Sequence, residues 1–189
     1  MVDSDDALRG QARRALFYGL AWGLGMILLG LAAWVFLRRA AARSAAAGSL
    51  VVGQPAPDFT LRALTGDEVR LGDQRGRVVV LNLWATWCEP CKAEMPLLQA
   101  LAVRHPDDLV VLGVNYGEEP ETVAAFVDEY GLTFPILLDP QHQVVRLYGV
   151  RGLPTTVFID AQGRVQGVHL GALDAAALRK YLRPLGVEP

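Results

Sequence analysis

Short apolar runs alternate with longer stretches of mixed polarity along the chain after residue 53. The runs Val78–Trp84 and Leu109–Asn115 are almost continuously apolar, which is typical of strands that are covered on both faces. Each run is followed by a stretch with helical spacing of its apolar residues, from Lys92 to Arg104 and from Glu119 to Tyr130. This alternation predicts an α/β domain in which helices flank a central sheet.

Two hairpins are expected on either side of these alternating elements. Alternation of polar and apolar residues around turn sequences predicts Asp58–Leu64 paired with Glu68–Leu71, and Thr155–Ile159 paired with Arg164–His169. A last helix is predicted from Ala175 to Arg183, where basic residues gather towards the C-terminal end as the helix dipole favours.

The segment from Ala15 to Leu37 carries no charge and is bracketed by pairs of arginines. As a helix it would be about 34 Å long, enough to span a hydrocarbon layer of about 30 Å. A core helix is rarely apolar for so long, and a cleaved signal peptide has a shorter apolar region. We therefore predict a cytoplasmic segment 1–14, a transmembrane signal anchor 15–37, a linker 38–52 and a folded domain 53–189.

The arginines do not decide the orientation of this anchor, since three precede it and three follow it closely. We expect the N-terminus in the cytoplasm and the folded domain outside it, because a dithiol in the cytosol needs no tether. Residues 53–189 carry 12 basic and 17 acidic side chains, a net charge of −5. This balance argues against nucleic acid as a partner, and only the anchor is expected to contact the lipid bilayer.

The chain has only two cysteines, within Trp87-Cys88-Glu89-Pro90-Cys91, between a predicted strand and a predicted helix. A Cys-x-x-Cys in this context is typical of a thioredoxin-like redox dithiol. Unpaired N–H groups and the positive dipole end at a helix start stabilise a thiolate, which makes it a better nucleophile and leaving group. The predicted redox group is the disulfide Cys88–Cys91, with no further cofactor.

Other interpretations of the two cysteines fit the sequence less well. Zinc would need a second ligand pair, but His105, His142 and His169 are scattered, so we predict no metal site. Haem attachment needs a histidine directly after the second cysteine, where this chain has Lys92. A purely structural disulfide would close too small a loop to constrain the unfolded chain much.

Three motifs give the chain its resemblance to a known family. They are Asn82-Leu-Trp-Ala-Thr-Trp-Cys-Glu-Pro-Cys-Lys-Ala-Glu-Met-Pro96, Gly152-Leu-Pro-Thr-Thr-Val-Phe-Ile-Asp160 and Gly53-Gln-Pro-Ala-Pro-Asp-Phe59. The stretch from Gly53 to about Arg183 resembles membrane-anchored thioredoxin-like oxidoreductases of the TlpA/ResA type, which carry a redoxin or AhpC/TSA-like domain. The resemblance implies a thioredoxin fold, with a central mixed sheet, and a domain that works outside the cytoplasm. It also implies reduction of protein disulfides, for example in apocytochrome c during cytochrome c maturation, with electrons from a membrane-embedded thiol donor.

The same resemblance assigns roles to individual residues. Cys88 would be the exposed attacking thiol and Cys91 the buried resolving thiol. Pro154 would be a cis-proline that packs against the dithiol from a facing loop. Trp87, Glu89 and Pro90 would support the site, and the residues between the cysteines would influence its reduction potential.

Glu94 is a further candidate, because Cys88, Cys91 and Glu94 lie along roughly one face of the predicted helix. The resemblance places an acidic residue here in the active site, where it would raise the pKa of a buried thiol or accept its proton. The strand before the dithiol holds Asn82 where cytosolic thioredoxins have a buried aspartate. Because an amide cannot act as a general base, Glu94 becomes the stronger candidate for the residue that accepts the proton of a thiol.

Two alternative functions remain at this point. Relatives of this fold include peroxide-reducing peroxiredoxins, but their Pro-x-x-x-Thr-x-x-Cys motif does not match the residues before Cys88. A copper-carrying assembly factor would hold Cu(I) between soft thiolates, usually with an added histidine that this chain does not obviously place. We therefore predict a thiol–disulfide oxidoreductase.

Overall fold

The computed structural model describes Gly30, Trp34 and residues 50–189. The chain divides into two units, Met1–Ala45 and Ala46–Pro189, and the second contains the folded domain.

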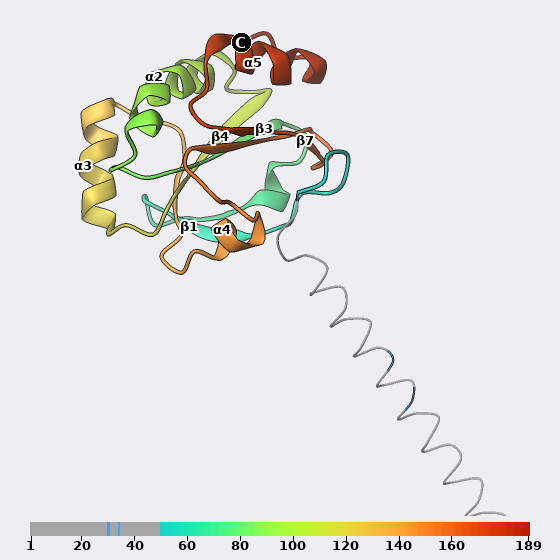
Figure 1. Ribbon diagram of the computed structural model, residues 1–189, viewed down its shortest axis with the longest axis horizontal. Coiled ribbons are helices and arrows are strands. Elements are labelled where there is room, and N and C mark those ends of the chain that lie inside the picture. The colour runs from blue at the N-terminus through green and yellow to red at the C-terminus, as the bar shows by residue number, and fades with distance from the viewer. Residues whose placement is uncertain (1–29, 31–33, 35–49) are drawn as a thin grey trace, which may run out of the picture. The chain divides into compact units, whose positions relative to one another are not determined.

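A seven-stranded sheet forms the centre of this domain, in the order β2-β1-β5-β4-β3-β6-β7 (Figure 1). The strands are β1 (Thr60–Ala63), β2 (Glu68–Arg70), β3 (Val78–Trp84), β4 (Leu109–Asn115), β5 (Ile136–Leu138), β6 (Thr155–Ile159) and β7 (Val165–Leu170). Along its whole length β3 pairs in parallel with β4, and on its other side it pairs antiparallel with β6. The sheet is therefore mixed, as expected, and β3 is held on both sides.

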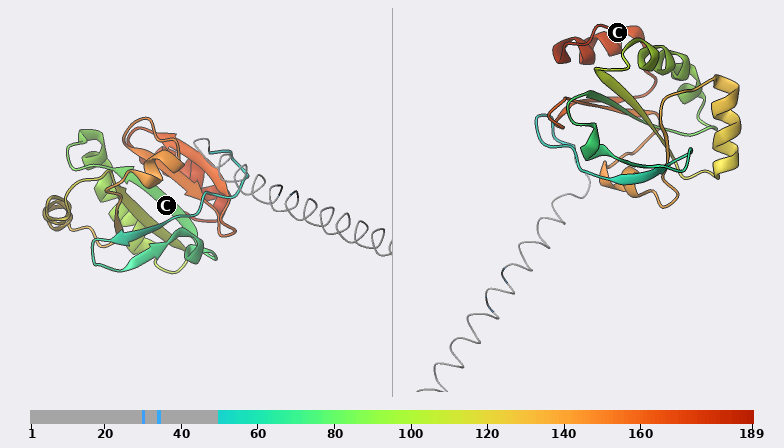
Figure 2. Two further views of the ribbon diagram at one scale, coloured as in Figure 1. Left: turned by 90° about the horizontal axis from the view of Figure 1, so that it is seen from below. Right: turned by 180° about the vertical axis from the view of Figure 1, so that it is seen from behind.

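Helices cover both faces of the sheet (Figures 1 and 2). They are α2 (Glu89–Arg104), α3 (Pro120–Tyr130), α4 (Gln143–Leu147) and α5 (Ala175–Leu182), with 3₁₀ turns η1 (Leu71–Gln74) and η2 (Arg183–Leu185). On one face α2, α3 and α5 share a core that includes Trp84, Phe126 and Leu178. On the other face α4 packs near β1 in a core that includes Leu81 and Val145. Every residue of β3 and β4 is buried, which explains why these strands are apolar throughout.

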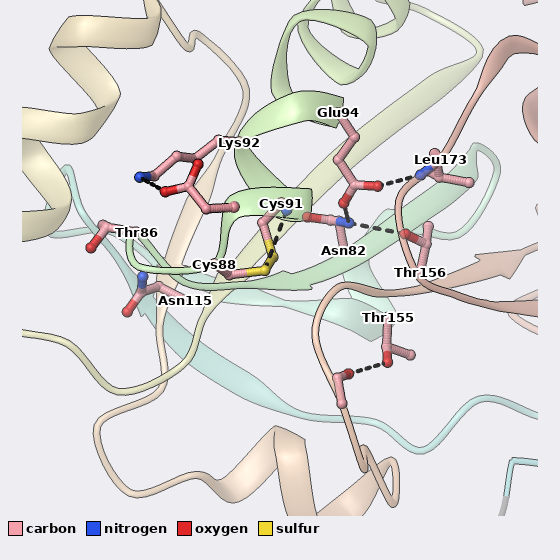
Figure 3. Close-up of a disulfide and its surroundings, with 12 residues drawn as sticks. Asn82, Thr86, Cys88, Cys91, Lys92, Glu94, Asn115, Thr155, Thr156 and Leu173 are labelled. Carbon is pink, nitrogen blue, oxygen red and sulfur yellow. Dashed lines mark hydrogen bonds and ion pairs between the residues drawn. A yellow bond between two sulfur atoms is a disulfide. The ribbon is translucent and has the colours of Figure 1, made fainter.

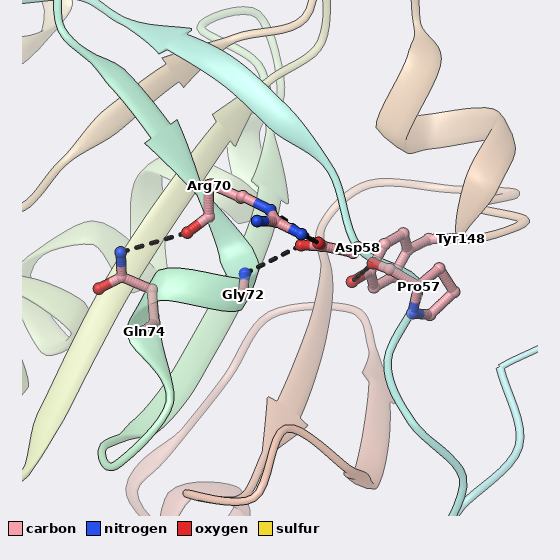
Figure 4. Close-up of polar contacts among 6 residues, drawn as sticks. All are labelled: Pro57, Asp58, Arg70, Gly72, Gln74 and Tyr148. Carbon is pink, nitrogen blue, oxygen red and sulfur yellow. Dashed lines mark hydrogen bonds and ion pairs between the residues drawn. The ribbon is translucent and has the colours of Figure 1, made fainter.

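Polar contacts fasten the segment before β1 to the rest of the domain (Figure 4). Asp58 Oδ2 accepts hydrogen bonds from the guanidinium of Arg70, at 2.8 Å from Nε and 2.5 Å from Nη2. Its Oδ1 accepts the backbone N–H of Gly72 at 2.9 Å. The hydroxyl of Tyr148 donates to the carbonyl of Pro57 at 2.8 Å. These bonds anchor the N-terminal hairpin to the face that carries α4.

The predicted elements agree with the structure to within a few residues. The strands β3, β4 and β6 have the predicted bounds, whereas α2 begins at Glu89 and not at Lys92. The helix starts earlier because Cys88 is its N-cap and Pro90 fits the first turn, where no N–H partner is needed.

The predicted anchor from Ala15 to Leu37 lies outside the described residues, except for Gly30 and Trp34. Within the described part of the chain, none of the helices combines the length and the apolar character needed to cross a membrane.

Candidate active site

The two cysteines form a disulfide at the point where β3 leads into α2 (Figure 3). Cys88 is the N-cap of α2, and its sulfur accepts the backbone N–H of Cys91 at 3.3 Å. The N–H groups of a first helical turn have no partner within the helix, and together they form the positive end of the helix dipole. The Cys88 sulfur therefore occupies a position that favours negative charge.

The sulfur predicted to be exposed is largely covered in the disulfide. Cys88 is only 5% exposed and Cys91 is fully buried, so the prediction of an exposed Cys88 is wrong for this state. Its sulfur is bonded to Cys91 and faces the helix start, which leaves little of it towards solvent. The neighbouring Trp87, by contrast, is 63% exposed and makes a T-shaped contact with Tyr116, with ring centroids 6.4 Å apart.

The peptide bond between Leu153 and Pro154 is cis, as the resemblance implied. Pro154 directly precedes β6, and its carbonyl accepts the N–H of Gly171 at 2.9 Å. The next residue, Thr155, donates its hydroxyl to the carbonyl of Gly152 at 2.7 Å. The loop that carries Pro154 is thus fixed both to itself and to the end of β7.

Glu94 lies inside the domain, one turn after Cys91 on α2 (Figure 3). It is 1% exposed, which excludes the alternative of an ordinary surface glutamate. Its Oε1 accepts the side-chain amide of Asn82 at 2.7 Å, and its Oε2 accepts the backbone N–H of Leu173 at 2.6 Å. The Asn82 amide also donates to the hydroxyl of Thr156 at 2.9 Å. Glu94 therefore joins α2 to β3 and, through Asn82, to β6, and it also binds the loop before α5.

Burial raises the pKa of the Glu94 carboxyl. The hydrogen bonds from Leu173 and Asn82 stabilise the carboxylate and act in the opposite direction, but the effect of burial is larger. Glu94 consequently holds its proton to higher pH than an exposed glutamate does.

Glu89, between the two cysteines, is on the surface and pairs with Lys92 at 2.5 Å. The hydrogen bond to Glu89 raises the pKa of Lys92. Such an i, i+3 pair is screened by solvent and contributes little to stability. Its main effect is to place one negative and one positive charge at the start of α2.

Sequence reasoning missed one residue beside the dithiol, Glu118. Its carboxylate accepts hydrogen bonds from both the backbone N–H and the hydroxyl of Thr86, two residues before Cys88. The available signal was the spacing Asn115-x-x-Glu118 after a buried strand, since the Asn115 side chain accepts the Glu118 N–H at 3.0 Å. That spacing predicts a turn but not the partner of the carboxylate.

Groups of three or more His, Cys, Asp or Glu side chains that could hold a metal ion are absent from the described residues. In the surroundings of the disulfide, Figure 3 shows the start of α2, the carboxylate of Glu94 and Thr155, the residue after the cis-proline.

The model of the AhpC/TSA family matches residues 52–168, which is more than half of the chain. The chain belongs to this family. The chain is 42% identical over 138 residues to the thiol–disulfide oxidoreductase ResA of Geobacillus thermodenitrificans, covering 72% of this chain and 79% of the relative. The thioredoxin-like protein YneN of Bacillus subtilis is 42% identical over 133 residues, covering 69% of this chain and 78% of YneN.

The solved structures agree with this assignment. A putative thiol:disulfide interchange protein DsbE from Chlorobium tepidum superimposes with a TM-score of 0.68 at 35% identity, covering 72% of this chain and 99% of the other. This member of the AhpC/TSA family therefore has the thioredoxin-like fold. It is a thiol–disulfide oxidoreductase of the ResA type, and its redox group is a disulfide.

The raised pKa of Glu94 predicts how the stability of the oxidised protein depends on pH. Between the ordinary glutamate pKa, about 4.3, and the raised value, the folded state binds more protons than the unfolded state. The free energy of unfolding therefore falls as pH rises through this window, by about 1.4 kcal/mol for each unit of pKa shift. Glu94→Gln should lack this fall, and denaturant unfolding of both proteins at a series of pH values measures the difference.

The Glu94→Gln variant is suited to this comparison because it can keep its contacts. The Asn82 Oδ1 atom has no hydrogen-bond partner among the described residues. A half turn of the Asn82 amide would let this oxygen accept a hydrogen bond from the new glutamine. Parallel stability curves for the two proteins would contradict the assignment of a raised pKa to Glu94.

Proposed function

We propose that this oxidoreductase reduces disulfides of protein substrates outside the cytoplasm, with Cys88 as the attacking thiol. The observation that carries this proposal is the position of the Cys88 sulfur at the N-terminus of α2, where it accepts the N–H of Cys91. A thiolate there is stabilised by the helix start and reacts readily with a disulfide. Cys91 is fully buried and one turn further along the helix, which suits a thiol that reacts only with Cys88.

The reaction proceeds by two exchanges. The thiolate of Cys88 attacks one sulfur of the substrate disulfide, whose S–S bond breaks, and the second substrate sulfur leaves as a thiolate. Cys91 loses its proton and attacks the Cys88 sulfur, which releases the first substrate sulfur as a thiolate. The substrate gains two electrons, the enzyme ends as the Cys88–Cys91 disulfide, and a membrane-embedded thiol donor restores the dithiol. Apocytochrome c is the substrate class that the resemblance to the TlpA/ResA type supports.

The supporting residues have distinct roles in this proposal. The cis Leu153–Pro154 bond presents backbone to the substrate beside the dithiol, and Trp87 offers an exposed apolar surface next to Cys88. Glu89 and Pro90 tune the potential from between the cysteines. Glu94 governs the protons of the dithiol, because a buried carboxylate one turn from Cys91 opposes a second negative charge there.

The division of roles between the thiols can be tested by trapping. Cys91→Ser should accumulate a mixed disulfide between Cys88 and the substrate, because the resolving sulfur has been removed. Cys88→Ser should form none, since the attacking sulfur is gone. Non-reducing electrophoresis after acid quenching, followed by mass spectrometry, measures both results and identifies the trapped substrate. Equal trapping by the two variants would show that the roles are assigned wrongly.

Glu94→Gln should move thiolate formation to lower pH, because a like charge next to the dithiol is removed. The two thiols are coupled, so the measured quantities are apparent pKa values of the pair. The absorbance of the thiolate or the rate of alkylation against pH reports the shift in the reduced protein. Superimposable curves for wild type and variant would remove Glu94 from the proton chemistry.

The placement outside the cytoplasm rests on the predicted signal anchor from Ala15 to Leu37 and on the resemblance to membrane-anchored relatives. A protease added to intact spheroplasts should then degrade the domain that begins near Gly53. A cytoplasmic protein probed in the same samples should survive. Protection of the domain until the cells are lysed would overturn this localisation.

A further inference from the structure

The carboxylate of Glu118 accepts hydrogen bonds from three donors on two residues, Thr86 in the loop before the dithiol and Asn115 at the end of β4. Its Oε2 lies 2.8 Å from the backbone N of Thr86 and 2.7 Å from Nδ2 of Asn115. Its Oε1 lies 2.5 Å from the hydroxyl of Thr86. Thr86 and Asn115 lie beside Cys88 in Figure 3. The loop that leads from β3 into Cys88 is therefore bound by its own backbone to the end of β4.

Other contacts join the same two parts of the chain, the one around the end of β3 and the one around the end of β4. The N–H of Tyr116 donates to the carbonyl of Trp84 at 2.8 Å, and the rings of Trp87 and Tyr116 form a T-shaped contact. Tyr116 in turn stacks on His142, with ring centroids 4.5 Å apart. Thr86, which binds Glu118, lies in the chain between Trp84 and Trp87, the two residues that contact Tyr116. Thr86 thus links Glu118 to the segment that carries Trp87 and Cys88.

Charge neutralisation does not account for this arrangement. Glu118 forms no salt bridge with the basic side chains of the described residues, and it is half-buried. Three hydrogen-bond donors compensate for its partial removal from water. A carboxylate can accept all three bonds without having to donate one. The side chain is therefore used as a multiple acceptor that fixes a loop.

We propose that Glu118 is a positioning residue for disulfide exchange. It holds Thr86, and through Thr86 it fixes the direction in which the Cys88 sulfur meets a substrate disulfide. The inference rests on the proposed function, because it requires Cys88 to be the attacking thiol. The thiolate itself is stabilised from α2, through the N–H of Cys91, and not by Glu118. Loss of Glu118 should consequently impair presentation of the sulfur more than formation of the thiolate.

Two substitutions separate positioning from charge. Glu118→Ala removes all three contacts. Glu118→Gln removes the charge and can keep the contacts, because its oxygen can accept both N–H donors while its amide donates to the Thr86 hydroxyl. Two further substitutions change the donor of the hydroxyl contact. Thr86→Val removes the hydroxyl, and Thr86→Ser keeps it. Glu121→Ala is the matched control, since this glutamate is exposed on α3 and its side chain has no hydrogen bond or salt bridge within the described residues.

The experiment mixes each pre-reduced full-length protein with excess oxidised insulin and follows the rate of enzyme oxidation at 25 °C. The thermal unfolding midpoint and the pH profile of Cys88 alkylation are measured on the same samples. Glu118→Ala should lower the second-order rate constant by about tenfold or more, as misplacement of a reacting group does, with little change in the alkylation profile. Thr86→Val should also lower it, whereas Glu118→Gln, Thr86→Ser and Glu121→Ala should stay close to wild type.

The double variant Thr86→Val/Glu118→Ala should be no slower than Glu118→Ala alone, because the hydroxyl contact that Thr86→Val removes is already lost in Glu118→Ala. A wild-type rate for Glu118→Ala, with or without a lower unfolding midpoint, would show that Glu118 has at most a structural role and would contradict the proposal. A loss for Glu118→Gln as large as that for Glu118→Ala would make charge the cause and overturn positioning. Activity retained in Cys88→Ser would instead refute the proposed function, whatever the Glu118 variants do.

Discussion

The hydrogen bond from the Cys91 N–H to the Cys88 sulfur is the interaction on which the site depends. It exists only because α2 begins at Glu89, a short loop after a strand whose end is fixed. β3 is bonded to β4 on one side and β6 on the other, and all of its residues are buried. The sheet therefore sets the place of the helix start, and the helix start sets the chemistry of the sulfur.

A second constraint opposes the first. The helix start favours a negative sulfur, whereas the buried carboxylate of Glu94 makes a second negative charge nearby costly. Its own pKa is raised by burial, and in the proposed function the carboxyl and the two thiols titrate as a coupled set. The strand supplies Asn82, a hydrogen-bond donor to Glu94, and the acid comes from the helix. The proton chemistry is thereby linked to α2, the same element that carries the cysteines.

Much of the fold follows from local patterns, but the site does not. The continuous apolar runs predicted β3 and β4 with the correct bounds, because a strand covered on both faces has no polar positions to obscure it. The spacing of Cys88, Cys91 and Glu94 indicated one helix face. It could not show that Glu94 meets the N–H of Leu173, 79 residues later, since that contact depends on how α5 packs.

The low exposure of Cys88 reflects its bond to Cys91 and its place at the helix start, which the sequence pattern alone does not show. The partners of Glu118 escaped prediction because they depend on the sheet order, in which β4 lies next to β3 although α2 separates them in sequence.

Glu94 and Glu118 show how one residue type serves two purposes around one disulfide. Glu94 is buried and bonds to β3 and to the loop before α5, and burial raises the pKa of its carboxyl. Glu118 is half-buried and bonds to the loop before Cys88, where three donors use it as an acceptor. None of these bonds involves a sulfur atom. The backbone on both sides of the dithiol is therefore held by contacts that do not include the disulfide bond itself.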